Sequence, residues 1–169
     1  MNNPYQSPTA DLQSKTNSLP LQYVGFWART AAYIIDSILL MLIVYPLLFL
    51  VLGTGAMDGT NPELMFSASY WIISFGLPVA FFIGFWFYKS STPGKMIFSA
   101  KIVDAKTGGK PSKGQLVGRY FAYILSGIPL GLGFFWIAWD KRKQGWHDKL
   151  SGTVVIKPTT NPAKQISFD

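Results

Sequence analysis

The chain has no cysteine and a single histidine among its 169 residues. Without cysteine it can form neither a disulfide nor a thiolate ligand or nucleophile. One histidine excludes a metal centre built on several imidazoles, so we expect no metal and no cofactor. No serine–histidine–aspartate set, phosphate-binding loop or suitably spaced carboxylate pair is present. We therefore expect no catalytic residue and no enzymatic activity.

Charged residues are also scarce, at 14% against 49% hydrophobic residues, and the hydrophobic residues gather in three long runs. Soluble domains rarely concentrate their apolar residues in this way. We predict an all-α integral membrane protein with three hydrophobic segments and a small cytoplasmic two-stranded β element. Residues 1–20 are expected to form a disordered tail, 21–157 the transmembrane domain and 158–169 a C-terminal tail.

The first hydrophobic segment is Phe26–Leu52, which holds only two charged residues, Arg29 and Asp36. At about 1.5 Å per residue it can cross a hydrocarbon core of about 30 Å with some tilt. The second segment runs from Ala68 to Tyr88 without a charge. The third, Leu116–Trp139, is interrupted by the helix-breaking sequence SGIPLGLG.

Positive charge lies almost entirely in the second half of the chain. Of 15 Lys and Arg residues, 13 stand at or after Lys89, six of them in the loop 89–113 and six after Asp140. The loop 53–67 carries acidic residues and no Lys or Arg. Cytoplasmic loops are the basic ones, so the N terminus and the loop 89–113 are predicted to be inside. Basic segments flanking apolar spans favour anionic lipid headgroups as the partner, not nucleic acid.

The third segment leaves two topologies open. A third full crossing would place the basic tail outside, against the positive-inside rule. We favour a helical hairpin, broken within Gly127–Gly133, that returns to the cytoplasmic face. The alternative is a straight third helix followed by an exposed basic tail.

Two short stretches have the alternation of a half-buried strand. In residues 96–103, MIFSAKIV, apolar side chains alternate with more polar ones, and Gly152–Lys157 reads GTVVIK. The sequence KTGGKP at 106–111 is typical of a turn. We predict that 96–103 and 153–157 pair as strands on the cytoplasmic side.

Arg29 and Asp36 are seven residues apart and share one helix face, roughly 10.5 Å from each other. Asp36 lies about 15 Å from the start of its span, near the predicted midplane, and its side chain is too short to reach the headgroups. Its predicted partners are Arg29, Arg119 or water. Two roles stay open: an ion- or proton-linked site, or a buried ion pair or helix N-cap contact that fixes how the spans dock.

His147 and Asp148 lie in a stretch, 139–150, that mixes tryptophans with cations and suits the headgroup level. The histidine could shuttle protons with its neighbour. The simpler interpretation is an exposed interfacial side chain.

A turn motif follows the second span directly, and it consists of Thr92, Pro93, Gly94 and Lys95. It could bind an anionic ligand. We prefer the interpretation of a Pro-Gly turn that ends the helix before a strand.

Three ordered motifs resemble those of the RDD family of small membrane proteins, which is named for one arginine and two aspartates. GFWARTAAYIID matches the first and gives Arg29 and Asp36, STPGKMIFSAKIVD resembles the motif after the second span, and QGWHDKLSGTVVI supplies Asp148. The resemblance covers about residues 21–157. It implies a membrane protein and suggests transport, including sodium–proton exchange in some members.

We therefore expect a multi-pass protein of the bacterial inner membrane with a cytoplasmic N terminus. Its expected role is cation- or proton-linked transport, as a homo-oligomer because three spans are few for a monomeric transporter. The alternative is a non-transporting scaffold or assembly partner whose Arg and Asp residues are structural.

Overall fold

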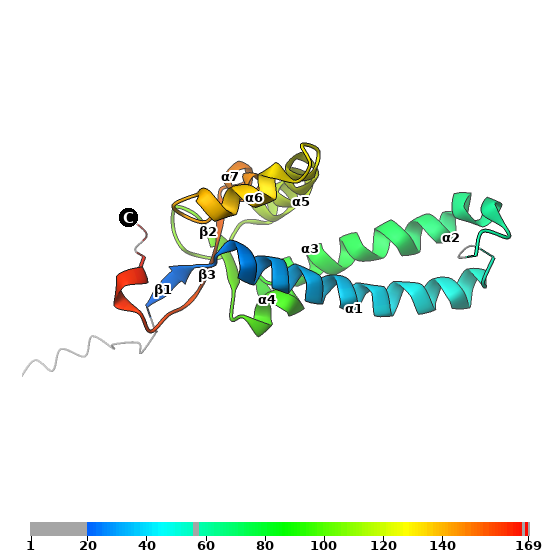
Figure 1. Cartoon of the computed structure of the whole chain (residues 1–169), viewed down its shortest axis with the longest axis horizontal. Coiled ribbons are helices and arrows are strands. Elements are labelled where there is room, and N and C mark those ends of the chain that lie inside the picture. The colour runs from blue at the N-terminus through cyan, green and yellow to red at the C-terminus, as the bar shows by residue number, and fades with distance from the viewer. Residues whose placement is uncertain (1–19, 56–57, 167, 169) are drawn as a thin grey trace, which may run out of the picture.

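The computed structural model describes residues 20–55, 58–166 and 168. The predicted tail 1–20 therefore lies outside the described residues apart from Pro20. The molecule is elongated, with a helical hairpin at one end and a small sheet covered by short helices at the other (Figure 1).

The hairpin is built from the first two predicted spans. Helix α1, Phe26–Leu52, forms one arm, and the other runs continuously over Ala68–Lys89. That second arm consists of α2 (Ala68–Trp71), a π-helical turn (Ile72–Gly76) and α3 (Leu77–Lys89). A short 3-10 helix, Pro62–Phe66, lies in the connection. Both arms are long and apolar enough to cross a membrane, as predicted.

The third segment is a helical hairpin and not a straight helix. Helix α5, Lys113–Gly127, and helix α6, Leu132–Trp139, meet at an angle of 100°. The chain reverses through Leu130 and Gly131, whose φ values of 51° and 77° no continuous helix contains. Gly133 permits the close approach of α6 to α5, because a Cβ atom at this position would lie only 2.6 Å from the Cα atom of Ser126.

Both ends of this α5–α6 hairpin attach to the sheet. Near the start of α5, Gln115 Nε2 donates to the carbonyl of Gly152 over 3.2 Å. Just after α6, the guanidinium of Arg142 donates to the carbonyl of Ala105. The segment therefore returns to the end of the molecule from which it started, and the straight-helix alternative is wrong.

The sheet has three antiparallel strands in the order β1-β3-β2. These are β1 (Leu21–Tyr23), β2 (Lys101–Asp104) and β3 (Thr153–Pro158). Opposite residues include Ile102 with Val155 and Val103 with Val154. The predicted pairing of the two stretches is confirmed for β2 and β3, whereas a third strand, β1, was not predicted.

The prediction of a strand over 96–103 is wrong for its first half. Residues Pro93–Ile97 form the short helix α4 instead. Thr92 caps this helix by accepting from the N–H of Lys95, and Pro93 stands at the first helical position, where proline is favoured. This local start signal outweighs the alternation of Met96 and Phe98.

Two apolar clusters cover the two faces of the sheet. One holds Ile102 and Val155 with Trp86 and Leu116 from α3 and α5. The other holds Val103 and Val154, covered by residues near the C terminus such as Ile166 and Phe168. A last helix, α7 (Trp146–Ser151), leads into β3, and a 3-10 turn, Pro162–Lys164, follows it. By contrast, only 11% of the apolar window of either hairpin arm is buried, as suits helices that face hydrocarbon.

Candidate functional site

Asp148 is the centre of a buried polar cluster at the sheet end of the molecule. It lies in the first turn of α7, its side chain is fully buried, and its Oδ2 atom accepts from the N–H of Gly145 over 2.9 Å. Burial alone would raise the pKa of Asp148, but the guanidinium groups of Arg119 and Arg29 hold it well below the usual value. The carboxylate is therefore ionised at neutral pH.

Arg29, on the first turn of α1, binds Asp148 and two main-chain carbonyls. Its Nη1 atom lies 2.5 Å from Oδ2 of Asp148. Nε donates to the carbonyl of Val24 over 3.0 Å, and Nη2 to that of Lys143 over 2.6 Å. One side chain thus ties the start of α1 to the segments before it and around α7.

Arg119, on α5, approaches Asp148 from the other side and is fully buried. Nη1 pairs with Oδ1 of Asp148 and donates to Thr153 Oγ1 over 2.5 Å. The guanidinium lies 5.7 Å from the ring centres of both Trp86 and Tyr123. Its Nε and Nη2 atoms have no hydrogen-bond partner within residues 20–55, 58–166 and 168. The aromatic faces supply part of the stabilisation that water would otherwise give this cation.

His147 is buried, not exposed at an interface, so the simpler sequence interpretation is wrong. Its ring stacks on Tyr123 with 4.1 Å between centres, and Phe134 covers it from α6. Nδ1 lies 3.3 Å from Ser126 Oγ, and Nε2 lies 3.6 Å from Oδ2 of Asp148. Burial lowers the pKa of His147 to about 3, so the imidazole is neutral in the folded protein.

This neutral histidine makes stability depend on pH. The histidine of the unfolded chain binds a proton below pH about 6.5, while His147 in the folded protein resists protonation down to about pH 3. Stability is therefore full above pH 6.5 and falls by about 1.4 kcal/mol per pH unit below it. Unfolding in detergent between pH 7.5 and 4.5 should show this slope, and His147→Phe should remove it. An equal slope in both proteins would contradict the assignment.

Asp36 lies apart from this cluster and is bound by Thr92 and Gly94. The motif 92–95, predicted to be a Pro-Gly turn before a strand, instead caps and begins helix α4. Thr92 Oγ1 donates to Oδ2 over 2.5 Å, and the N–H of Gly94 donates to Oδ1 over 2.7 Å. The predicted pairing with Arg29 or Arg119 is wrong, since both bind Asp148 instead. The motif does bind an anion, but that anion is the chain's own carboxylate, held at the N-terminal end of α4, where negative charge is favoured.

The level of Asp36 along the hairpin also differs from the prediction. Its partners Thr92 and Gly94 follow closely on Lys89, where α3 ends. Asp36 is therefore level with the end of α3 rather than midway along the hairpin arms. The preceding part of α1 is packed into the sheet end, where Arg29 and Ala32 are buried.

Lys95 follows Gly94 on α4 and is almost fully buried, at 8% exposure. Burial lowers its pKa, and the positive charges of Arg119 and Arg29 act in the same direction, while Asp36 acts against them. Lys95 is thus a titratable group that feels both Asp36 and the Asp148 cluster.

The sequence model of the RDD family matches residues 23–152. The chain belongs to the RDD family. Relatives include the uncharacterized protein YxaI of Bacillus subtilis, 38% identical in an alignment 148 positions long that covers 78% of this chain and 95% of YxaI. The uncharacterized membrane protein YteJ of the same species is 31% identical over 79% of this chain and 80% of YteJ.

The uncharacterized protein RP437 of Rickettsia prowazekii is 39% identical over 97 residues, 57% of this chain, and the match spans 54% of RP437. No solved structure matches the chain significantly. The match to the RDD family, the relative described as a membrane protein and the two long apolar helices together identify this chain as a membrane protein.

The arginine and second aspartate of the RDD pattern meet in the structure, while the first aspartate, Asp36, binds elsewhere. Sequence reasoning missed Tyr123 and Thr153 as neighbours of Arg119. Tyr123 had a detectable signal, because an aromatic residue four positions after an arginine lies on the same helix face. Among the described residues, no three His, Asp or Glu side chains could jointly hold a metal ion.

Proposed function

We propose that this RDD protein is a non-transporting scaffold or assembly partner in the bacterial inner membrane. One observation carries the proposal. Arg29, Arg119 and Asp148, from α1, α5 and α7, join three distant segments into one locked unit at the sheet end. A second lock, from Asp36 to α4, fixes the helix that follows the second span.

The bonding of these groups supports a structural role. Breaking a buried ion pair is costly, so its members hold their positions. Asp148 is enclosed by two guanidinium groups and a main-chain N–H, and Arg29 uses all three of its nitrogen atoms in hydrogen bonds. Such bonding favours a rigid platform over a site that exchanges ions with water.

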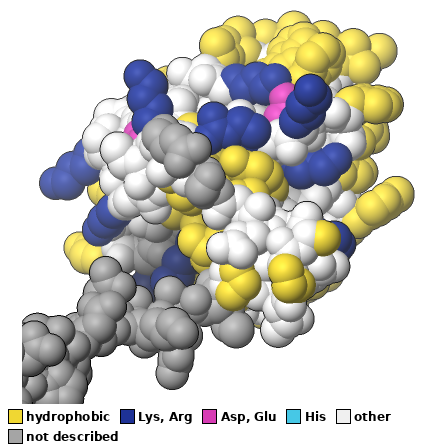
Figure 2. All heavy atoms as spheres, turned by 90° about the vertical axis from the view of Figure 1, so that its left-hand side faces the viewer, with side chains coloured by type: hydrophobic (Ala, Val, Ile, Leu, Met, Phe, Trp, Pro, Cys, Tyr) yellow, Lys and Arg dark blue, Asp and Glu magenta, His cyan; other side chains and the backbone are white. Residues whose placement is uncertain are grey.

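We also propose that the sheet end is cytoplasmic. Lys and Arg side chains stand around this end in Figure 2, as the positive-inside rule requires of a cytoplasmic face. Trp27 lies near the start of α1 and Trp139 at the end of α6, and their side chains are 80% and 74% exposed. Exposed tryptophans at this position fit the aromatic belt at a membrane interface. Glu63, in the connection at the far end of the hairpin, would then be periplasmic.

Labelling tests this orientation cleanly, because the chain has no cysteine to remove. A cysteine introduced at exposed Lys164 should react with a membrane-impermeant maleimide only after the cytoplasmic side is opened. A cysteine at Glu63 should react in intact spheroplasts. Reaction of the Lys164→Cys protein from the periplasmic side would contradict the proposed topology.

The second candidate function is cation- or proton-linked transport by a homo-oligomer. Lys95 favours it, since a buried amine with a lowered pKa can change charge while Asp36 lies nearby. Three hydrophobic segments are few for one transport path, so this role would need several copies.

A flux assay separates the two functions. Purified wild type in proteoliposomes should show no more sodium or proton flux than empty liposomes, and Asp36→Asn and Lys95→Met should leave this unchanged. A flux in wild type that both variants abolish, while their melting temperatures in detergent stay within a few degrees, would replace the scaffold by transport.

A further inference from the structure

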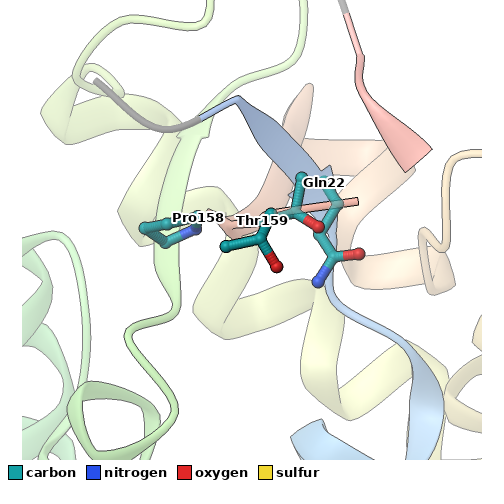
Figure 3. A pocket seen from close by; sticks show the side chains of 4 residues that line it. Gln22, Pro158 and Thr159 are labelled. Carbon is teal, nitrogen blue, oxygen red and sulfur yellow. The ribbon is translucent and has the colours of Figure 1, made fainter. Parts of the chain in front are cut away.

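Two hollows at the surface of the sheet end differ in the charge of the side chains that line them. One, of about 220 Å³, lies at the edge of β1 and β3 and is lined by Gln22, Pro158, Thr159 and Thr160 (Figure 3). It carries no charged side chain. The other, of about 260 Å³, lies where α3, β2 and the turn after β2 meet, and three lysines line it.

The three lysines of this second hollow come from three different elements. Lys89 is the last residue of α3, Lys101 the first of β2, and Lys110 follows the turn. All three side chains are exposed, and none is in a salt bridge with another part of the described chain. Their ammonium groups are therefore available to an external anion. The backbone of Gly108 and Gly109 lines the same hollow.

The walls of the hollow are fixed by internal hydrogen bonds. Asp104 Oδ1 accepts from the N–H groups of Lys106 and Thr107 over 2.9 and 2.8 Å, which holds the turn. Its other oxygen accepts from Gln115 over 2.5 Å, so the carboxylate is already occupied. The carbonyl of Ser90 accepts from the N–H of Ile102 over 2.7 Å, so it is not left free beside the lysines.

The hollow lies at the end of a membrane span. Tyr88, which also lines it, is the next-to-last residue of the second hairpin arm and is 85% exposed. Exposed tyrosines at span ends sit at headgroup level. The hollow has a volume of about 260 Å³. One water needs only about 10–15 Å³ of such space, so a phosphate group has room to enter.

We propose that this hollow, lined by Lys89, Lys101 and Lys110, binds the phosphate of an anionic phospholipid headgroup. Lysines bind phosphate as point charges, and those near an anionic membrane surface each add to the attraction. Tyr88 then lies at the level of the headgroup, and the apolar side chains of α3 lie beside the acyl chains. This binding goes beyond the scaffold role and does not depend on it.

The test compares two triple variants of the full-length protein in detergent. Lys89→Gln/Lys101→Gln/Lys110→Gln removes the site, and Lys141→Gln/Lys157→Gln/Lys164→Gln removes the same charge elsewhere. Each protein is titrated with short-chain phosphatidylglycerol, short-chain phosphatidylcholine, glycerol phosphate and inorganic phosphate. Binding is followed by calorimetry, and melting without lipid checks that each variant is folded.

Wild type and the control variant should bind phosphatidylglycerol far more tightly than phosphatidylcholine. The site variant should bind it on the order of 100-fold more weakly, since each lysine contributes about fivefold. Equal losses in both triple variants would overturn the site in favour of general attraction. Glycerol phosphate or inorganic phosphate that binds as tightly as the lipid would overturn the lipid as its source.

Discussion

Asp148→Asn should destabilise the protein more than any other single substitution of a charged residue. The asparagine keeps the shape but leaves Arg29 and Arg119 buried without a counter-charge. Breaking a fully buried pair in this way costs about 3–5 kcal/mol, or roughly 6–20 °C in melting temperature for a chain of this size. The measurement is thermal unfolding of the purified protein in detergent, together with the yield of folded protein from membranes.

Glu63→Gln is the matched control, because it removes a carboxylate that is exposed in the connection between the hairpin arms. Its melting temperature should stay within about 2 °C of wild type, as for most surface substitutions. Arg119→Met should also lose stability, by removing one of the two partners of Asp148. An Asp148→Asn protein as stable as the control would show that the cluster does not hold the segments together.

Gly94→Ala should separate α4 from α1. A Cβ atom at this position would lie 2.1 Å from the carbonyl oxygen of Ala32 and 3.0 Å from Cγ of Asp36, and backbone cannot move aside as a side-chain end can. Overpacking and the loss of the Gly94–Asp36 hydrogen bond together predict about 3 kcal/mol or more of destabilisation. Thermal unfolding in detergent measures it.

Gly118→Ala provides the control for this substitution. Gly118 lies on α5, and a Cβ there would meet nothing within 4 Å. Alanine is favoured over glycine inside a helix by about 0.5–1 kcal/mol, so this variant should be as stable as wild type or slightly more so. If Gly94→Ala behaved like Gly118→Ala, close packing of α4 on α1 would not be the reason for glycine at position 94.

Sequence patterns predicted the long elements of the fold and missed short ones, among them β1, α4 and α7. Spans such as Phe26–Leu52 are recognised by the length and hydrophobicity of a run of residues, and both can be read from a single sequence. Strand β1, Leu21–Tyr23, exists because the edge of β3 is available to it, and no local pattern of three residues can indicate this. Apolar and polar side chains do alternate in 96–103. The capping of α4 by Thr92 nevertheless makes the beginning of this stretch helical and not a strand.

The sequence singles out the buried charged residues but does not indicate which of them bind one another. Arg29, Asp36, Arg119, His147 and Asp148 were all singled out, because charged and titratable groups are rare in such an apolar chain. Their pairing was not, since helix periodicity joins Arg29 to Asp36 on one face, whereas Arg29 binds Asp148. Only the tertiary fold decides between a neighbour seven residues away and one at the other end of the chain.

The ion pair between Arg29 and Asp148 joins residues 119 positions apart, and this separation bears on synthesis. At about 5–20 residues per second, the ribosome needs roughly 6–24 s to reach Asp148 after Arg29 has been made. During that time α1 and α3 can enter the bilayer, but the arginine has no counter-charge. The last fifth of the chain thus completes the structure, because a product that ends before Asp148 leaves Arg29 and Arg119 without their shared counter-charge.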